Sequence, residues 1–335
     1  METKRKWRFG VNRWIVLACV ILGIIGANNF APVQPHILVK PEELTSQGLI
    51  IPGIGEIKLT NTMVAMFIVD ALLVLMIIAV QRAVRKSSLV PSGFSGAIEF
   101  LLEALYGLTE TSAGKWARRI FPYFFSIFIV VLVGNFTKLL PGVESIGFLE
   151  ESPDGVPIQH LFGSISTIIP TGVGPKYTLV AFVRGLPTDL NFTVALALFS
   201  VIMTQVIGVR SQGFRYFSKF FNTLTLFSKP GFGAIDLAVS ILELISEFAK
   251  ILSFSFRLFG NMFAGMILLV LMGTMLPVFF PSLVLLFEVF IGAIQAFVFG
   301  MLTMVFMSQA AQGHGGEEHK EDHKELHAEV QASQA

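Results

Sequence analysis

Long apolar runs separated by polar segments divide most of this sequence. Three of the runs have the length of one membrane crossing, at about residues 61–81, 121–140 and 191–209. About 20 residues at ~1.5 Å per residue span a hydrocarbon core of ~30 Å. Together with the longer apolar segments that follow, this pattern predicts an all-α, polytopic membrane protein with about five to six membrane helices.

The last two apolar segments are too long to cross a membrane upright. No proline interrupts the chain between Pro230 and Pro277, so a helix over most of this stretch is roughly 60 Å long. The segment from Ser282 to about Gln312 is roughly 45 Å long by the same rise. Helices with this much excess length tilt in the bilayer. We therefore expect a long, strongly tilted helical hairpin that turns at Pro277 and Pro281.

The first 30 residues combine a basic start with an apolar run. Five lysines and arginines lie within residues 1–13, and the run from Trp14 to Gly26 ends beside the small residue Ala27. A cleaved signal peptide and a retained first membrane helix both fit this pattern. Residues 31–59, rich in proline, glycine and glutamate, are predicted to form an exposed outer loop.

Positive charges set the expected orientation of the crossings. Basic residues lie at one end of each: Arg82 and Arg85 after the first, Arg118 and Arg119 before the second, and Arg210 at the end of the third. Because lysine and arginine accumulate on the cytoplasmic side, we expect these ends inside. The net acidic loop from Pro141 to Pro187 is then expected outside.

Three further features of the crossings carry predictions. Residues 91–119 interleave glutamates with apolar residues, which predicts an amphipathic segment on the inner surface. Lys138, near the outer end of the second crossing, is expected to extend its ammonium to the interface. Asp70, in the middle of the first crossing, is either a proton relay or a carboxyl that faces the bundle and stays protonated or hydrogen-bonded, and the second interpretation is favoured.

Composition agrees with a membrane protein. The 335 residues are 53% hydrophobic and 14% charged, whereas soluble domains carry about 25% charged residues. A net charge of +1 argues against nucleic-acid binding, and the single Cys19 excludes an intrachain disulfide. Residues 312–335 form a charged tail without aromatics, predicted to be disordered, and its histidines are not expected to bind a metal.

A polar stripe runs along the first of the two long helices. Six residues follow one another at steps of three or four: Glu243, Ser246, Lys250, Ser253, Arg257 and Asn261. At ~100° per residue they share one face of a helix. A charge in hydrocarbon costs from ~3 to more than ~10 kcal/mol, so Arg257 marks a functional site.

Arg257 stays protonated, so it cannot relay protons and must act on a carboxylate that passes it. At ~4 Å and an effective dielectric of about 20 the attraction is about 4 kcal/mol, or about three pKa units. On the facing helix Glu288 and Gln295, seven residues apart, share a face. With Glu243 on the other side of Arg257, the spacing predicts two half-length proton paths. The alternative is a structural ion pair between Arg257 and Glu288.

Five stretches carry a family resemblance: LELISEFAK, SFRLFGNMFAG with Arg257, EVFIGAIQAFVFGMLT with Glu288, NFTKLLPG from Asn135, and LPTDLNFTVALAL from Leu186. They resemble subunit a of the F-type ATP synthase membrane sector over about residues 60–311. The resemblance implies a subunit beside a rotating ring of c subunits, each with a membrane-buried carboxyl.

The resemblance also implies roles for individual residues. Arg257 and Asn261 match the family's arginine and asparagine. Gln295 matches its glutamine, Glu288 an acidic or histidine position, and Glu243 the acidic residue ahead of the arginine. Further polar residues are expected along the access paths: Ser253, Asn135, Asp189, Asn191 and Asp70.

Two departures from the family pattern matter. Met266 stands where several members carry a titratable residue, so the outer path is expected to depend on Glu288 alone. Lys138 stands where some members carry an acid, so it is not expected to be a relay.

As implied by the resemblance, the chain is a non-catalytic proton-channel subunit of a bacterial inner membrane, with its C-terminal tail in the cytoplasm. Its expected partners are the c ring, b-type peripheral stalk subunits and, through the complex, the F1 sector (alpha, beta, gamma, delta and epsilon), where the ATP chemistry would occur. No cofactor is expected. An independent secondary transporter that uses Arg257 and Glu288 is the alternative, and a purely structural subunit is a third hypothesis. Coupling to protons or to sodium, and the size of the ring, stay open.

Overall fold

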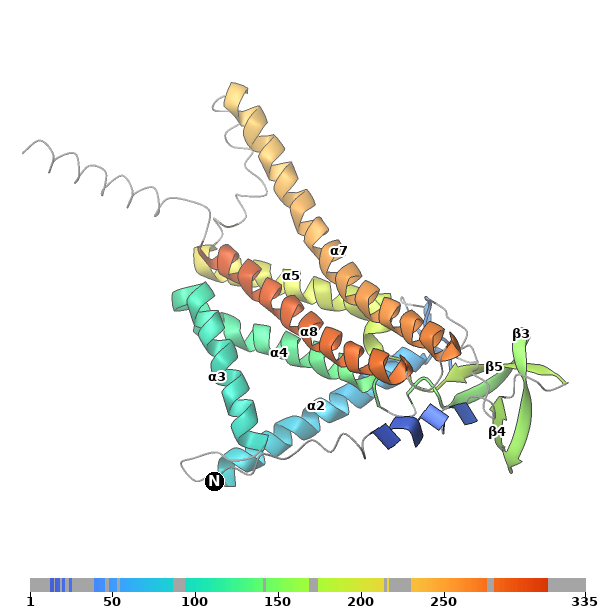
Figure 1. Cartoon of the computed structure of the whole chain (residues 1–335). Helices are drawn as coiled ribbons and strands as arrows, with labels where there is room; N and C mark the ends of the chain where they lie inside the picture. The colour runs from blue at the N-terminus through green and yellow to red at the C-terminus, as the bar shows by residue number, and fades with distance from the viewer. Residues whose placement is uncertain are drawn as a thin grey trace, which may run out of the picture. The chain divides into compact units, whose positions relative to one another are not determined.

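The computed structural model describes residues 39–45, 48–52, 55–86, 94–140, 143–168, 174–213, 216, 230–275 and 280–312, and scattered residues between 13 and 25. The predictions for most of residues 1–30 and for the tail from residue 313 lie outside the described residues. Long helices dominate the described part (Figure 1). Within it, five helices are long and apolar enough to cross a membrane, which confirms the all-α, polytopic class.

Three helices correspond to the three predicted single crossings. They are α2 (Asn61–Lys86), α4 (Ala117–Thr137) and α5 (Leu190–Gln212). The side-chain Oγ1 of Thr60 accepts a hydrogen bond from the backbone N–H of Met63 at 3.4 Å, which satisfies one free donor in the first turn of α2. The sequence placed these helices to within a few residues because each run is predominantly apolar.

The segment predicted to lie on the inner surface forms a helix of its own, α3 (Phe94–Ala113). The 3-10 turn η1 (Gly114–Trp116) separates it from α4, and Gly114 has a positive φ of 50° that favours glycine. The glutamates of α3 are exposed, whereas Leu105 and Thr109 are buried. This distribution agrees with the expected amphipathic helix, and its place on the inner surface stays a prediction.

The two long apolar segments are the helices α7 (Pro230–Met275) and α8 (Phe280–Gln312). With 46 and 33 residues they are roughly 70 Å and 50 Å long, well beyond a ~30 Å hydrocarbon core. The predicted pair of over-long helices is therefore confirmed. Their tilt in a bilayer stays a prediction.

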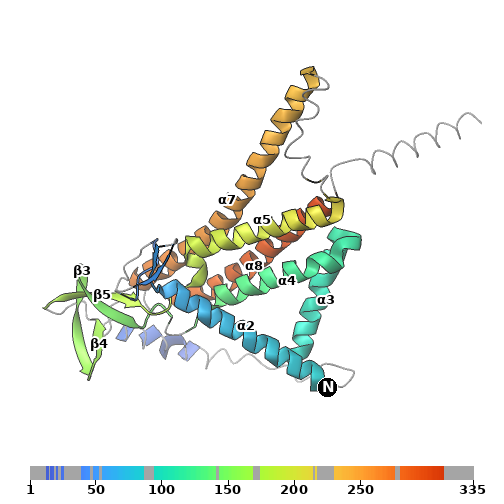
Figure 2. The same ribbon diagram turned by 180° about the vertical axis from the view of Figure 1, so that it is seen from behind.

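The two segments predicted to be outer loops contain strands that the sequence analysis missed. β1 (Leu49–Ile51) pairs with β2 (Gly55–Ile57) in an antiparallel hairpin. β3 (Gly147–Phe162), β4 (Ile165–Ile168) and β5 (Lys176–Ala181) form an antiparallel sheet in the order β4-β3-β5, seen from two sides in Figures 1 and 2. The stretch from Pro141 to Pro187 was predicted to be a loop. The pairing of β3 with β5 shifts register between Glu151 and Val156, which accommodates Pro153 and Gly155 within the strand.

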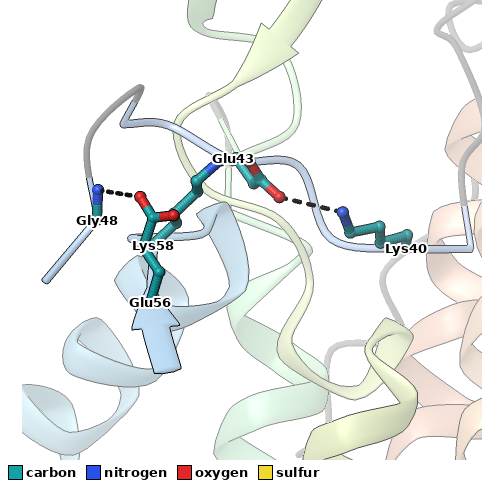
Figure 3. A network of polar contacts seen from close by, with 5 residues as sticks. All are labelled: Lys40, Glu43, Gly48, Glu56 and Lys58. Carbon is teal, nitrogen blue, oxygen red and sulfur yellow. Dashed lines mark hydrogen bonds and ion pairs between the residues drawn. The ribbon is translucent and has the colours of Figure 1, made fainter. Parts of the chain in front are cut away.

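A small network of charges surrounds the first hairpin (Figure 3). The carboxylate of Glu43 accepts hydrogen bonds from Lys40 at 3.1 Å and Lys58 at 2.9 Å, and Glu56 accepts one from the backbone N–H of Gly48 at 2.9 Å. Hydrogen bonds from the two lysines lower the pKa of Glu43. These groups are solvent-exposed, and such pairs contribute little to stability.

The chain divides into two compact units, and each is described by itself. The first comprises Met1–Pro91, Ile127–Leu196 and Ser253–Phe299. Its core includes Ala65, Val69 and Leu186, which pack against Val133 and Phe192 among others.

The second unit comprises Ser92–Ser126, Ala197–Leu252 and Gly300–Ala335. Hydrogen bonds join its helices: Ser200 to Thr303 at 2.7 Å, and Ser308 to the carbonyl oxygen of Ser112 at 2.8 Å. Such polar contacts between apolar helices are a common means of association in membranes.

Candidate functional site

Polar contacts in the first unit place α7 and α8 antiparallel with a defined register. The side-chain Nδ2 of Asn261 donates a hydrogen bond to Oε1 of Gln295 at 2.7 Å. A Cβ atom at Gly265 would lie only 2.6 Å from Oε1 of Glu288, so this carboxylate rests directly on the backbone of α7. Two predicted site residues of α8, Glu288 and Gln295, are thus opposite positions 265 and 261 of α7.

Arg257 lies on the same face of α7 as Asn261, one turn nearer the N-terminus of the helix. Its side chain is exposed, and among the described residues its guanidinium has one recorded contact, to Oγ of Ser253 at 3.5 Å. The alternative of a structural ion pair between Arg257 and Glu288 is wrong for the described residues, because Glu288 pairs with Lys138 instead. The side-chain oxygen of Gln295 accepts its hydrogen bond from Asn261. The guanidinium of Arg257 is therefore exposed and takes no part in the recorded contacts between α7 and α8.

Glu288 is paired with Lys138, and this corrects the expectation that Lys138 reaches the membrane interface. Nζ of Lys138 lies 3.1 Å from Oε1 of Glu288, and both side chains are 5% exposed. Burying either charge alone would be costly, so each provides the counter-charge that makes the other tolerable. One turn earlier on α4, Nδ2 of Asn135 donates to the carbonyl oxygen of Gly292 at 2.8 Å, which holds α4 against α8.

A second carboxyl, Glu144, lies just beyond the end of α4. Its Oε1 accepts a hydrogen bond from the backbone N–H of Gly185 at 3.0 Å, and its backbone has a positive φ of 62°. Burial raises the pKa of Glu144; the Gly185 N–H and the charges of Lys138 and Arg184 lower it, but by less. The structure thus gathers Lys138, Glu144, Arg184 and Glu288 into one charged cluster.

Replacing Glu144 with glutamine is expected to stabilise the protein at neutral pH. The raised pKa means that the folded chain holds this proton more tightly than the unfolded chain, so the free energy of unfolding falls as pH rises from the ordinary glutamate pKa of 4.5 through the folded pKa. Glutamine keeps the acceptor for Gly185 and removes the buried charge. We expect the melting temperature of Glu144→Gln to exceed that of the wild type by a few degrees at neutral pH, with the advantage shrinking as the pH falls toward that value.

The control is Glu150→Gln, which alters an exposed glutamate of β3 and is expected to leave the melting temperature unchanged at every pH. A lower melting temperature for Glu144→Gln at neutral pH would mean that attraction to Lys138 and Arg184 outweighs the burial of the carboxylate.

Other predicted residues lie apart from this hairpin. Asp189 is buried and accepts hydrogen bonds from Oγ1 of Thr62 at 2.8 Å and from the backbone N–H of Asn191 at 2.9 Å, so it fastens the start of α5 to the start of α2. The side chain of Asn191 is exposed. Asp70 is also exposed, which contradicts the favoured interpretation of a carboxyl facing the bundle: it lies on a side of α2 that no described residue covers.

In the second unit, the polar stripe contains a residue that the sequence analysis did not select. Glu247 is 8% exposed and forms an ion pair with Lys250 at 3.1 Å, and the Lys250 ammonium lies 4.8 Å from the centroid of the Phe306 ring on α8. Glu243 is half-buried and Ser246 is exposed. The sequence does indicate this ion pair, because Glu247 lies three residues before Lys250 on the same helix and residues at this spacing are neighbours.

The sequence is similar to known proteins over most of its length. Residues 63–308 match the family described as ATP synthase A chain. The chain is 28% identical to ATP synthase subunit a of Moorella thermoacetica over 262 residues, which cover 78% of this chain and 95% of the relative. It is 29% identical to ATP synthase subunit a 1 of Syntrophotalea carbinolica over 228 residues, or 68% of this chain and 77% of the relative.

Proposed function

The chain belongs to the ATP synthase A chain family, and on that premise we propose that it passes protons through two half-paths to and from the carboxyls of a rotating c ring. It is a multi-pass membrane protein by its five long apolar helices. In this proposal it couples proton flow to ATP synthesis without itself being catalytic, and the ATP chemistry belongs to the F1 sector. Its partners would be the c ring and b-type stalk subunits.

The observation that carries the proposal is the exposed guanidinium of Arg257. It projects from a helix apolar enough to cross a membrane, and its one recorded contact among the described residues is the hydroxyl of Ser253. A charge in this position requires a counter-charge from outside the described chain. A carboxylate on a neighbouring ring supplies one, and about 4 kcal/mol of attraction at ~4 Å is enough to make it release its proton.

The outer half-path would run along the α7–α8 contact. Gly265, Asn261 and Arg257 follow at steps of four residues, roughly 6 Å each, so Glu288 lies about two turns from the arginine. Gln295 lies between these levels, and its Nε2 is buried without a hydrogen-bond partner among the described residues. Such a donor suits an ordered water, which could carry a proton between Glu288 and the ring carboxyl.

Lys138 has a positioning role in this outer half-path. Its ion pair fixes one oxygen of the Glu288 carboxylate at 3.1 Å, and Asn135 holds the same two helices together. Lys138 therefore takes part through Glu288, which revises the expectation that the outer path depends on Glu288 alone.

The inner half-path would begin at the other end of the polar stripe. Glu243 is half-buried there, and it precedes the ion pair of the buried Glu247 with the half-buried Lys250 on the same helix. Glu243 is the proposed exchange group, with Ser253 beside Arg257 as the last polar residue before the ring. Asp189, Asn191 and Asp70 would have at most accessory parts, because their contacts and exposure set them apart from this stripe.

Replacing Glu288 with glutamine tests the proposal. Glutamine keeps an oxygen acceptor for Lys138 but cannot exchange a proton, so ATP-driven acidification of inverted vesicles is expected to slow by roughly tenfold or more. ATP hydrolysis, measured in the same vesicles, should continue. Glu110→Gln, at an exposed position of α3, serves as the control and should acidify normally. An unchanged rate for Glu288→Gln in assembled complexes would remove Glu288 from the path.

A further inference from the structure

A cavity lined by arginines lies in the second unit, apart from the α7–α8 contacts of the first. It has a volume of about 520 Å³ and is formed by η1, the start of α4 and the end of α5. Arg118, Arg119 and Arg210 line it together with Trp116 and Tyr123. The two views of the fold agree that the beginning of α4 and the end of α5 are side by side (Figures 1 and 2).

The charge in this cavity is unbalanced. None of its lining residues is acidic, and the described part of the chain records no ion pair for any of the three arginines. The guanidinium of Arg119 lies over the Trp116 ring, 5.0 Å from its centroid, which orients one cation of the group. Three neighbouring cations repel one another, and a bound anion removes this repulsion.

The geometry of guanidinium groups indicates the class of anion. Arginine forms paired hydrogen bonds with the oxygens of a phosphate group. Several arginines together therefore favour a phosphate over an anion with less charge and fewer acceptor oxygens. A volume of about 520 Å³ lies within the usual range of small-molecule sites, roughly 300–1,000 Å³. The site therefore suits a phosphate that carries an organic substituent.

The surroundings favour a lipid as the source of that phosphate. Both α4 and α5 belong to the apolar helices able to cross a membrane, and tryptophan and tyrosine are enriched where such helices meet the headgroups. On α5, Leu198, Phe199 and Ile202 are exposed apolar residues that precede Ile207 and Arg210. These residues offer the acyl chains of a lipid an apolar surface to pack against while the arginines hold its headgroup. Free phosphate has no apolar part that could contact this surface.

We infer that this arginine cavity binds the phosphate headgroup of an anionic phospholipid of the inner leaflet. The inner leaflet follows from the positive charges, which are expected on the cytoplasmic side. A lipid held between the start of α4 and the end of α5 would fasten these two helices together at the membrane surface. The inference does not depend on which residues carry protons.

The test uses the intact complex, purified in detergent and exposed to equal amounts of phosphatidylglycerol and phosphatidylcholine. Retained lipid is counted by native mass spectrometry. The variant Arg119→Gln/Arg210→Gln is expected to lose retained phosphatidylglycerol several-fold at this site relative to the wild type, with phosphatidylcholine unchanged. Arg82→Gln, which removes an exposed arginine at the end of α2 outside the cavity, should retain as much phosphatidylglycerol as the wild type.

A second measurement needs no substitution. A photoactivatable phosphatidylglycerol on the wild-type complex is expected to label peptides containing Trp116 to Tyr123 or Ile207 to Arg210. The inference is overturned if this subunit is labelled only elsewhere, or if the cavity variant retains phosphatidylglycerol like the wild type. It is also overturned if the variant loses only bound inorganic phosphate, since that would identify the occupant as free phosphate.

Discussion

Replacing Arg257 with alanine is expected to abolish ATP-driven acidification of inverted membrane vesicles. The guanidinium is the one group at this level of α7 that stays positive at any relevant pH, and its recorded contact to Ser253 leaves its charge unneutralised by the described chain. Without it, a passing carboxyl would lose about 4 kcal/mol of attraction, or about three pKa units, and would keep its proton. The two half-paths would also no longer be separated by a fixed positive charge.

The measurement compares acidification with ATP hydrolysis in the same vesicles. Ser253→Ala removes the recorded hydrogen-bond partner of Arg257 but keeps the charge, and should leave most of the acidification. Arg82→Ala removes an exposed arginine from another helix and should leave all of it. Normal acidification by Arg257→Ala in assembled complexes would contradict the proposed role and would favour a purely structural subunit.

Replacing Lys138 with methionine is expected to have the second-largest effect, on stability as well as on proton flow. Methionine matches the length of the apolar stem but leaves the carboxylate of Glu288, 5% exposed, without its counter-charge. Breaking a buried ion pair from one side costs about 3–5 kcal/mol, because the remaining charge stays buried. The variant is therefore expected to melt at a lower temperature and to conduct protons slowly.

A double substitution separates the two effects. In Lys138→Met/Glu288→Gln both charges of the pair are removed together, so neither is left without its counter-charge, and we expect most of the stability to return while proton conduction stays low. Lys58→Met is the matched control, since it removes a lysine whose ion pair with Glu43 lies at the surface (Figure 3). If Lys138→Met melts and conducts like the wild type, the Lys138–Glu288 contact has no part in fold or function.

The sequence predicted the helices well because their signal is local. Each crossing is a predominantly apolar run of about 20 residues, and the length of α7 follows from the absence of proline between Pro230 and Pro277. The sheet of β3, β4 and β5 was missed because its pairing is decided between distant segments. Pro153 and Gly155 argue against a strand locally, and only the register shift seen in the structure accommodates them.

The candidate site was predictable to the extent that it repeats along one helix. Arg257 and Asn261 stand out by spacing alone, and Gln295 and Glu288 by sharing a face. The partner of Glu288 was not predictable, because Lys138 is 150 residues away and its reach to the interface is the ordinary behaviour of a lysine at a helix end. Glu144 was also missed, since its burial depends on the folded turn around Gly185.

The exposed guanidinium of Arg257 affects the stability of the subunit before it is assembled into a complex. Until a neighbouring subunit supplies a carboxylate, the helix holds an uncompensated cation at a cost of at least about 3 kcal/mol. The unassembled subunit is thus destabilised by this free-energy cost, and assembly removes it. Membrane quality control can therefore distinguish the unassembled from the assembled subunit by its lower stability. The same arginine would then both keep the two half-paths apart and lower the stability of the unassembled protein.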